Sequence, residues 1–240
     1  MGDGPGIDWS RIKLVAFDVD GTLYAQRPLR LRVAAALIRH TVKSRNARTM
    51  AVLKTYRTLR EELGDTETPD FDRILLDRVA QHHALSPGLI REIVAEWMEQ
   101  RPLGSLARCR YPAVDRLFER IRASGRLIGI LSDYPAHAKL QAMTLSADHV
   151  VSAGEVGLLK PHPRGLQRLM ELAGTAPEET ILIGDRDERD GAAARRAGTA
   201  CLLRSRKPVP GVGTFTRFDD PIFDGVDYPL VVSSVTAGLT

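Results

Sequence analysis

The feature that most constrains the fold of this chain is a set of short, almost uninterrupted apolar segments. They lie at residues 12–17, 127–131, 149–152, 180–184 and 199–203. Segments of this length and composition are typical of β-strands that are buried on both faces of a sheet. Three helical patterns separate the later segments, at residues 113–123, 164–173 and 187–197. Strands that alternate with helices predict a parallel sheet with helices on both faces, an α/β fold of Rossmann-like type.

The stretch between the first two apolar segments, residues 24–110, contains no strand pattern and four helical ones. The first covers residues 31–43, with Leu31, Ala34, Ala35 and Ile38 on an apolar face and Arg32, Arg39 and Lys43 opposite. The second has apolar residues at helical spacing from Val52 to Leu63 and is expected to end at Gly64. Thr68-Pro69 and Ser86-Pro87 each predict an N-cap followed by a first-turn proline, and therefore open the third and fourth helices.

These patterns predict an α/β core formed by residues 1–23 and 111–240, into which a helical cap of residues 24–110 is inserted. The length of 240 residues is sufficient for one large domain with an insertion of this size. The segment from Lys207 to Thr240 is rich in glycine and proline and predicts no particular element.

Composition excludes several classes of protein. The chain is 43% hydrophobic and 27% charged, which is too apolar for a disordered chain. Its fully apolar stretches are too short for a membrane span, and Met1–Lys13 does not resemble a secretion signal. Cys109 and Cys201 are the only cysteines and predict no disulfide. We therefore expect a soluble, cytoplasmic protein, and the sequence leaves monomer and homodimer open.

Residues of types that often act in catalysis occur in four short motifs, three of which directly follow an apolar segment. Asp18 and Asp20 come directly after the first apolar segment, and Ser132 follows the second. Lys160 lies in a Leu-Leu-Lys-Pro sequence, and Asp185 and Asp190 follow the apolar segment at 180–184. The carboxyl ends of parallel strands meet at one edge of a sheet, where ligands bind in open α/β folds. Carboxylates that converge there repel one another unless a hard cation such as Mg²⁺ neutralises them, and a lysine and a serine suit phosphate oxygens.

The four motifs together, DxDGTL, a serine after a strand, Lys-Pro and GDxxxxD, resemble those of the haloacid dehalogenase (HAD) superfamily. The resemblance covers the whole predicted core, and the helical segment between the first two motifs resembles the helical cap of that family. It implies that Asp18 is a nucleophile forming an aspartyl-phosphate and that Asp20 is the general acid, with its backbone carbonyl on Mg²⁺. It also implies that Ser132 and Lys160 hold the phosphoryl group and that Asp185 and Asp190 support the metal ion together with Asp18.

Asp20 favours phosphoester chemistry within the superfamily, because dehalogenases and phosphonate hydrolases resemble this architecture but lack a carboxylic acid at that position. The sequence therefore predicts a Mg²⁺-dependent phosphatase acting on a small phosphorylated metabolite. A sugar phosphomutase and a non-catalytic, anion-binding regulatory protein are the alternatives. Of the nearby charged residues, Asp187 is interpreted as a helix N-cap or a solvated charge, and Arg186 and Arg189 as surface residues.

The charge distribution adds one more hypothesis. Residues 21–60 contain ten lysines and arginines and no acidic residue, although the whole chain carries a net charge of only +4. A field of this kind favours anionic ligands. A stripe such as Arg32, Arg39 and Lys43 is ordinarily a solvated helix face, and the functional alternative is that one or two cap arginines, such as Arg32 or Arg39, contact a second anionic group of the substrate. Nucleic acid is disfavoured as a partner because no aromatic residues interleave with these charges.

Overall fold

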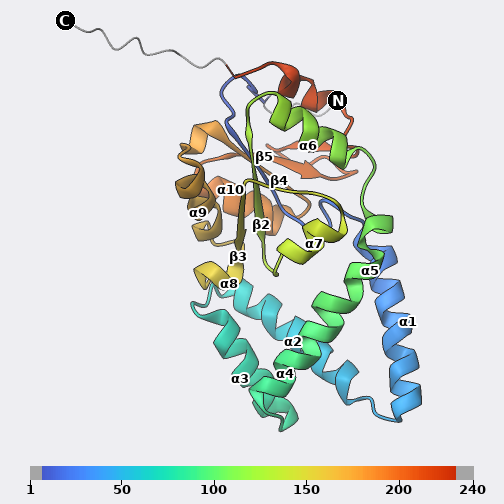
Figure 1. Ribbon diagram of the computed structural model, residues 1–240. Coiled ribbons are helices and arrows are strands. Elements are labelled where there is room, and N and C mark those ends of the chain that lie inside the picture. Colours follow the sequence, from blue (N-terminus) through green and yellow to red (C-terminus); the bar gives the residue numbers. More distant parts are fainter. Residues whose placement is uncertain (1–6, 231–240) are drawn as a thin grey trace, which may run out of the picture.

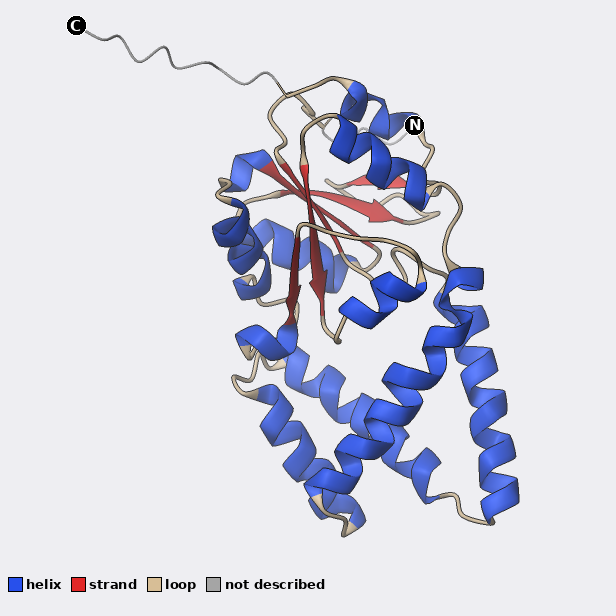
Figure 2. Ribbon diagram, viewed as in Figure 1, coloured by secondary structure: helices blue, strands red, loops and turns tan. Residues whose placement is uncertain are grey.

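The computed structural model describes residues 7–230 of the chain. At its centre is a six-stranded parallel sheet with the strand order β3-β2-β1-β4-β5-β6. The strands are β1 (Leu14–Phe17), β2 (Leu127–Ser132), β3 (His149–Ser152), β4 (Thr180–Gly184), β5 (Ala200–Arg204) and β6 (Gly213–Phe215). Helices cover both sides of this sheet (Figure 2). The predicted α/β fold is therefore confirmed.

β1 is the central strand, and its register decides where the motifs lie. Phe17 pairs with Ile130 on one side and with Ile183 on the other. The residues that follow these three positions therefore leave the sheet at the same edge. All four residues of β1 are buried, as expected for a strand that is covered on both faces.

Each face of the sheet has its own apolar layer. On one face the side chains of β1 pack against α6 (Val114–Ala123) and η4 (Pro221–Asp227). On the other face they pack against α9 (Arg164–Ala173) and α10 (Ala192–Ala197). The shorter helical elements of this part of the chain are α7 (His137–Ala142), α8 (Ala153–Val156), η2 (Pro177–Glu179) and η3 (Asp187–Gly191).

The segment between β1 and α6 is helical throughout and lies next to the edge at which the strands end (Figure 1). Its elements are α1 (Gln26–Ser44), α2 (Arg48–Asp65), α3 (Phe71–His83), α4 (Pro87–Val94), the π-helical turn η1 (Ala95–Gln100) and α5 (Arg101–Cys109). These helices have a separate apolar cluster, to which α2, α3, α4 and η1 contribute buried side chains. The chain enters and leaves this segment side by side, because Tyr24 forms an antiparallel bridge with Arg110.

Three details of the predicted helices differ from the structure. The face of α1 that holds Leu31 and Ile38 points to solvent, with Leu31 72% exposed, because α1 packs on its neighbours through Val33, Ala36 and Leu37 instead. The third helix begins at Phe71 and not at Pro69: Thr68 bonds to the Thr66 hydroxyl, and the chain turns through Asp70 at a positive φ of 51°. The fourth helix does begin as predicted, with the Ser86 hydroxyl accepting a hydrogen bond from the Leu89 amide.

Gly64 is the third difference, because α2 continues past it to Asp65. A side chain at position 64 would collide with the guanidinium of Arg189 and would approach the carbonyl of Lys160. The glycine therefore permits a close contact between α2 and η3, and its role is not to end the helix.

The segment from Lys207 that had no predicted element supplies β6 and η4, and its last ten residues lie outside the described range. Phe215, Phe218 and Phe223 of this segment are buried together beside Trp9. Both cysteines are free, in agreement with the expectation. Among the described residues, no helix combines the length and apolar character that crossing a bilayer requires.

Candidate active site

A cavity of about 540 Å³ lies between the ends of the strands and the helical segment. Five of the six candidate residues line it: Asp18, Asp20, Lys160, Asp185 and Asp190. They come from positions as far apart as 18 and 190 and meet because β1 and β4 are neighbours in the sheet. The juxtaposition expected from the strand order is therefore present.

Asp18 is buried immediately after β1, and both of its carboxylate oxygens are hydrogen-bonded. The ammonium group of Lys160 donates to Oδ1 at 2.6 Å, and the Thr22 hydroxyl donates to Oδ2 at 2.9 Å. Lys160 is itself buried and also donates to Asp190 at 2.7 Å. Burial alone would lower the pKa of Lys160, but the charges of Asp18 and Asp190 raise it well above its usual value, so this lysine stays protonated.

The carboxylate of Asp190 is held by the loop that follows β4. Its Oδ2 accepts hydrogen bonds from the backbone amides of Asp185 and Arg186, each at 3.1 Å. This arrangement requires glycine at two nearby positions. A Cβ at Gly184 would overlap the Asp190 side chain, and one at Gly21, where φ is +105°, would overlap the Asp185 carboxylate. The short motifs therefore use their glycines to bring these carboxylates close to the backbone.

Asp18, Asp185 and Asp190 form a group that fits a divalent cation. One oxygen from each of the three lies within 4.8 Å of the others, and all three carboxylates are wholly or partly buried. Burial raises the pKa of Asp18 well above its ordinary value, and the charges of Asp190 and Asp185 add to this increase against the opposing effect of Lys160. Burial and the Asp190 charge similarly raise the pKa of Asp185 to about 6. Oxygen donors that repel one another in this way are the set that a hard cation stabilises.

Asp20 has a different environment. Lys139, from α7, donates to both of its carboxylate oxygens, at 2.7 and 2.6 Å, and the Tyr24 hydroxyl donates to Oδ1. Burial would raise the pKa of Asp20, but Lys139 outweighs this effect and the net pKa is lowered. Asp20 is therefore ionised in the free protein, next to a carboxylate whose pKa is shifted in the opposite direction.

Ser132 is the candidate that the structure places differently. It ends β2 and is almost completely buried, and its hydroxyl accepts a hydrogen bond from the Tyr134 amide at 3.3 Å. It does not line the cavity, whereas Asp133 and Tyr134 do. Asp133 accepts a hydrogen bond from the Lys160 amide at 3.1 Å, so the turn after β2 also positions the loop that carries the lysine.

This geometry agrees with the relationships of the chain to known proteins. A family model for haloacid dehalogenase-like hydrolases matches residues 12–198, which include the sheet, the carboxylates and the helical segment. The chain belongs to this family of hydrolases. In this chain the helical segment lies between the first and second motifs, and the relatives of the chain include phosphatases.

One curated HAD relative and two solved structures illustrate these similarities. The chain is 28% identical over 227 residues to glyceraldehyde 3-phosphate phosphatase from Methanopyrus kandleri, with 91% of this chain and 94% of that protein covered. It has a TM-score of 0.62 with 2-haloacid dehalogenase from Pseudomonas syringae pv. Tomato DC3000, at 21% identity over 86% of this chain and 95% of that one. It has a TM-score of 0.60 with the HAD-hydrolase YfnB from Bacillus subtilis bound to magnesium, at 15% identity over the same fractions. At these identities the two structures support the fold.

The HAD cap supplies most of the other wall of the cavity. α1 contributes Leu29, Arg30 and Val33, α2 contributes Arg57 and Arg60, and η1 contributes Trp97 and Met98. Arg32 and Arg39, the cap arginines considered from the sequence, do not line it. The Arg32 guanidinium lies 4.0 Å from the Cys109 sulfur instead.

Arg189 was predicted to be a surface residue, and the structure shows that it is buried. It is only 5% exposed, and it donates to the Lys160 carbonyl at 2.8 Å, to Asp65 at 2.6 Å and to the Glu61 carboxylate at 2.9 Å. Arg186 also lines the cavity and pairs with Glu61 at 3.3 Å. Both arginines therefore connect the segment that follows β4 to α2. The sequence shows this segment only as polar and does not show that α2 covers it.

Lys139, Tyr24 and the pocket arginines are the residues that sequence reasoning missed. Lys139 lies seven positions after Ser132 in a short helix, where an isolated lysine has no distinguishing pattern. Tyr24 directly follows the first motif and lies four positions after Asp20. This spacing was the only feature of the sequence that could have indicated the contact. Asp187, interpreted as a helix N-cap or a solvated charge, follows the N-cap residue Arg186, lies outside the carboxylate group and pairs with Arg195 at 2.7 Å.

Proposed function

We propose that this protein is a Mg²⁺-dependent phosphomonoesterase that acts on a small phosphorylated metabolite through an aspartyl-phosphate on Asp18. The observation that carries the proposal is the pair of carboxylates Asp18, which is buried, and Asp20, which is partly buried. They lie two residues apart and have opposite electrostatic environments in one cavity. Asp18 is held by the buried Lys160 and belongs to the cluster of three carboxylates that suits a cation. Asp20 is available for proton transfer.

The first half of the reaction transfers the phosphoryl group to Asp18. A carboxylate oxygen of Asp18 attacks phosphorus, the bond from phosphorus to the ester oxygen breaks, and the leaving alkoxide takes up a proton. We assign the donor to Asp20. Because Asp20 is ionised in the free protein, this role requires that it first take up a proton from solvent, while Lys139 stays protonated and holds the carboxyl group in place.

The second half hydrolyses the acyl phosphate. Asp20 in its ionised form accepts a proton from a water molecule, which attacks phosphorus and releases inorganic phosphate and free Asp18. The hydrogen bonds from Lys139 and Tyr24 stabilise the ionised form and fix its orientation. Lys160 stabilises negative charge on the phosphoryl oxygens and keeps Asp18 in position, while Ser132 acts through the turn after β2.

We assign the cation to Asp18, Asp185 and Asp190, together with the backbone carbonyl of Asp20. When bound there, Mg²⁺ neutralises the carboxylates and polarises the phosphoryl oxygens. Residues 24–110 act in this scheme as a cap domain on a core formed by residues 1–23 and 111–240. The cap excludes bulk water from the cavity and supplies contacts to the leaving group.

The test is phosphate release from p-nitrophenyl phosphate and from a panel of natural phosphomonoesters, with Mg²⁺ and with EDTA. We expect release that depends on Mg²⁺ and disappears in the Asp18→Asn variant. Analysis of the organic product separates hydrolysis from mutase chemistry, because a phosphomutase returns an isomeric sugar phosphate and little free phosphate. A folded protein that is inactive on every substrate of the panel contradicts the proposal.

A further inference from the structure

The cavity is larger than the phosphoryl site alone requires. Its 540 Å³ lies within the range of pockets that enclose molecules of drug size. The carboxylates and Lys160 occupy the end at the sheet, and the opposite end is formed by α1, α2 and η1. The leaving group of a phosphomonoester bound at Asp18 therefore lies against the cap.

The charged side chains of the cavity divide into two sets. Five of the cationic residues have a hydrogen-bonding or ion-pairing partner within the protein: Arg60, Lys139, Lys160, Arg186 and Arg189. Arg30 and Arg57 form no ion pair and no side-chain hydrogen bond with any residue from 7 to 230. Both side chains are exposed to solvent and line the cavity, and within residues 7–230 they are its two cations without a protein partner.

The sequence explains why Arg30 and Arg57 have no acidic partner on their own helices nearby. Arg30 and Arg57 lie in the stretch of residues 21–60, which contains no aspartate or glutamate. Their neighbours on α1 and on most of α2 are therefore apolar, neutral or basic. Two acids of the pocket already have other partners, since Glu61 pairs with Arg186 and Arg189, and Asp20 pairs with Lys139.

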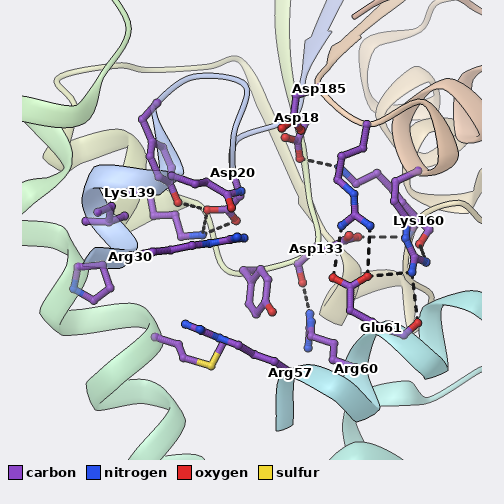
Figure 3. Close-up of a pocket in the computed structure, with 18 of the residues that line it drawn as sticks. Asp18, Asp20, Arg30, Arg57, Arg60, Glu61, Asp133, Lys139, Lys160 and Asp185 are labelled. Carbon is purple, nitrogen blue, oxygen red and sulfur yellow. Dashed lines mark hydrogen bonds and ion pairs between the residues drawn. The ribbon is translucent and has the colours of Figure 1, made fainter. Parts of the chain in front are cut away.

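The two arginines approach the cavity from different helices. Figure 3 shows Arg30 extending beside Asp20 and Lys139, and Arg57 entering the same cavity from α2. Tyr24 and Tyr134 line the same cavity as the two arginines. Apolar side chains lie on the same side of the cavity: Leu29, Val33, Trp97 and Met98.

From this arrangement we propose that Arg30 and Arg57 form a subsite for a second anionic group, so that the substrate is a phosphomonoester whose leaving group carries a phosphate or a carboxylate. This inference rests on the proposed function and specifies its substrate class. Guanidinium groups bind both kinds of oxyanion through paired, charge-assisted hydrogen bonds. The apolar side chains contact the carbon skeleton between the two anionic groups.

The experiment compares pairs of probes that differ in the second anionic group. Fructose 1,6-bisphosphate is compared with fructose 6-phosphate, and 3-phosphoglycerate with glycerol 3-phosphate. The first pair tests a second phosphate and the second pair tests a carboxylate. p-Nitrophenyl phosphate, which carries a single anionic group, reports the chemical step without the subsite. We expect kcat/KM to be higher for the two-anion member of at least one pair.

The variants are Arg30→Gln and Arg57→Gln, with Arg39→Gln as the matched control. Arg39 lies on α1 outside the cavity and, like Arg30 and Arg57, is exposed. Each pocket variant is expected to lower kcat/KM for the two-anion substrate by about 10- to 100-fold, mainly through KM, because one charge-assisted contact is lost. Activity on p-nitrophenyl phosphate is expected to change little, and Arg57→Lys is expected to recover part of the loss.

Results of two kinds overturn the subsite. One is an equal loss on p-nitrophenyl phosphate and on the two-anion substrate, which would place the arginines at the transferred phosphoryl group or in folding. The other is wild-type kinetics in both glutamine variants, or no preference within either pair of probes. In each case hydrolysis of p-nitrophenyl phosphate still supports the proposed function.

Failure of the proposed function has a separate signature. If the wild-type protein releases no phosphate from any probe, the phosphatase proposal is wrong, and calorimetry then decides the subsite. Fructose 1,6-bisphosphate and 3-phosphoglycerate are titrated into the Asp18→Asn protein with and without Arg57→Gln. Tighter binding with Arg57 intact supports the subsite, and equal binding or no binding contradicts it.

Discussion

The two ends of the cavity differ in how their charges are balanced. At the sheet, each of Asp18, Asp20 and Asp190 contacts a lysine, and one oxygen from each of Asp18, Asp185 and Asp190 lies within 4.8 Å of the others. At the cap, Arg30 and Arg57 have no acidic partner among the described residues and are exposed to the cavity. The sheet end is preorganised for one reaction, whereas the cap end depends on a charge that the ligand supplies. This difference is expected where chemistry and substrate selection lie on separate elements of the chain.

The largest effect expected at the sheet end comes from Asp18→Asn. An amide is a poor nucleophile, so turnover should fall by about 10⁴-fold or more, as for other enzymes that lose a nucleophile. Steady-state phosphate release measures this, and circular dichroism checks that the variant is folded. Asp187→Asn is the matched control, because Asp187 pairs with Arg195 outside the carboxylate group. Turnover retained in Asp18→Asn would exclude covalent catalysis by this residue.

Metal removal tests the same end of the cavity without a mutation. EDTA should reduce phosphate release to background, and Mg²⁺ should raise Tm because it relieves the repulsion among Asp18, Asp185 and Asp190. Saturation at about 100 times Kd corresponds to about 2.7 kcal/mol of added stability. Differential scanning fluorimetry measures the shift, which should disappear in Asp185→Ala and persist in Asp187→Asn. An unchanged Tm in the wild-type protein would argue against a cation on these residues.

Asp20→Asn should lower kcat by about 10²- to 10⁴-fold, the usual contribution of a general acid or base. The loss should be smaller for p-nitrophenyl phosphate than for an alkyl phosphate, because p-nitrophenolate needs little protonation to leave. Comparison of the two substrates therefore isolates the acid role from the base role. Equal losses on both would indicate that Asp20 acts only in hydrolysis of the aspartyl-phosphate.

Lys139→Met should have a smaller effect, about 10-fold on kcat, since it removes hydrogen bonds to a charged group and leaves the group itself in place. Lys139 lowers the pKa of Asp20 in the native protein, so its removal raises that pKa. The ionised form of Asp20 then requires a higher pH, and the acid limb of the pH–rate profile should move to higher pH. An unmoved profile would show that this ion pair does not control the Asp20 proton.

The smallest expected effect concerns the connection between the two ends. Arg189→Met removes a buried hydrogen bond to the Lys160 carbonyl and partly buried ones to Asp65 and Glu61, and should lower the free energy of unfolding by about 2 kcal/mol. Arg195→Met removes an exposed pair and should cost less than about 1 kcal/mol. Urea unfolding measures both. Equal values would mean that Arg189 does not hold the cap helix on the catalytic loop.

Local patterns were sufficient for much of the fold. The apolar segments predicted five of the six strands, because strands buried on both faces need continuous apolar sequence. They did not predict β6, which has only three residues and includes a glycine. The apolar face predicted for α1 points to solvent at Leu31 and Ile38, because helical periodicity shows that a face is apolar but not which neighbour covers it.

By itself, the sequence determined the α/β fold, the order of the motifs and the edge of the sheet at which the carboxylates meet. Each of these follows from local composition and from the geometry of parallel strands. Only the tertiary structure decided that Lys139 contacts Asp20, that Arg189 is buried under α2, and that Arg30 and Arg57, not Arg32 and Arg39, line the cavity. These contacts join residues whose spacing along the chain has no regular relation to their separation in space. They depend on the rotation of each helix about its axis and on the position of the cap relative to the sheet. Packing across the whole molecule determines both.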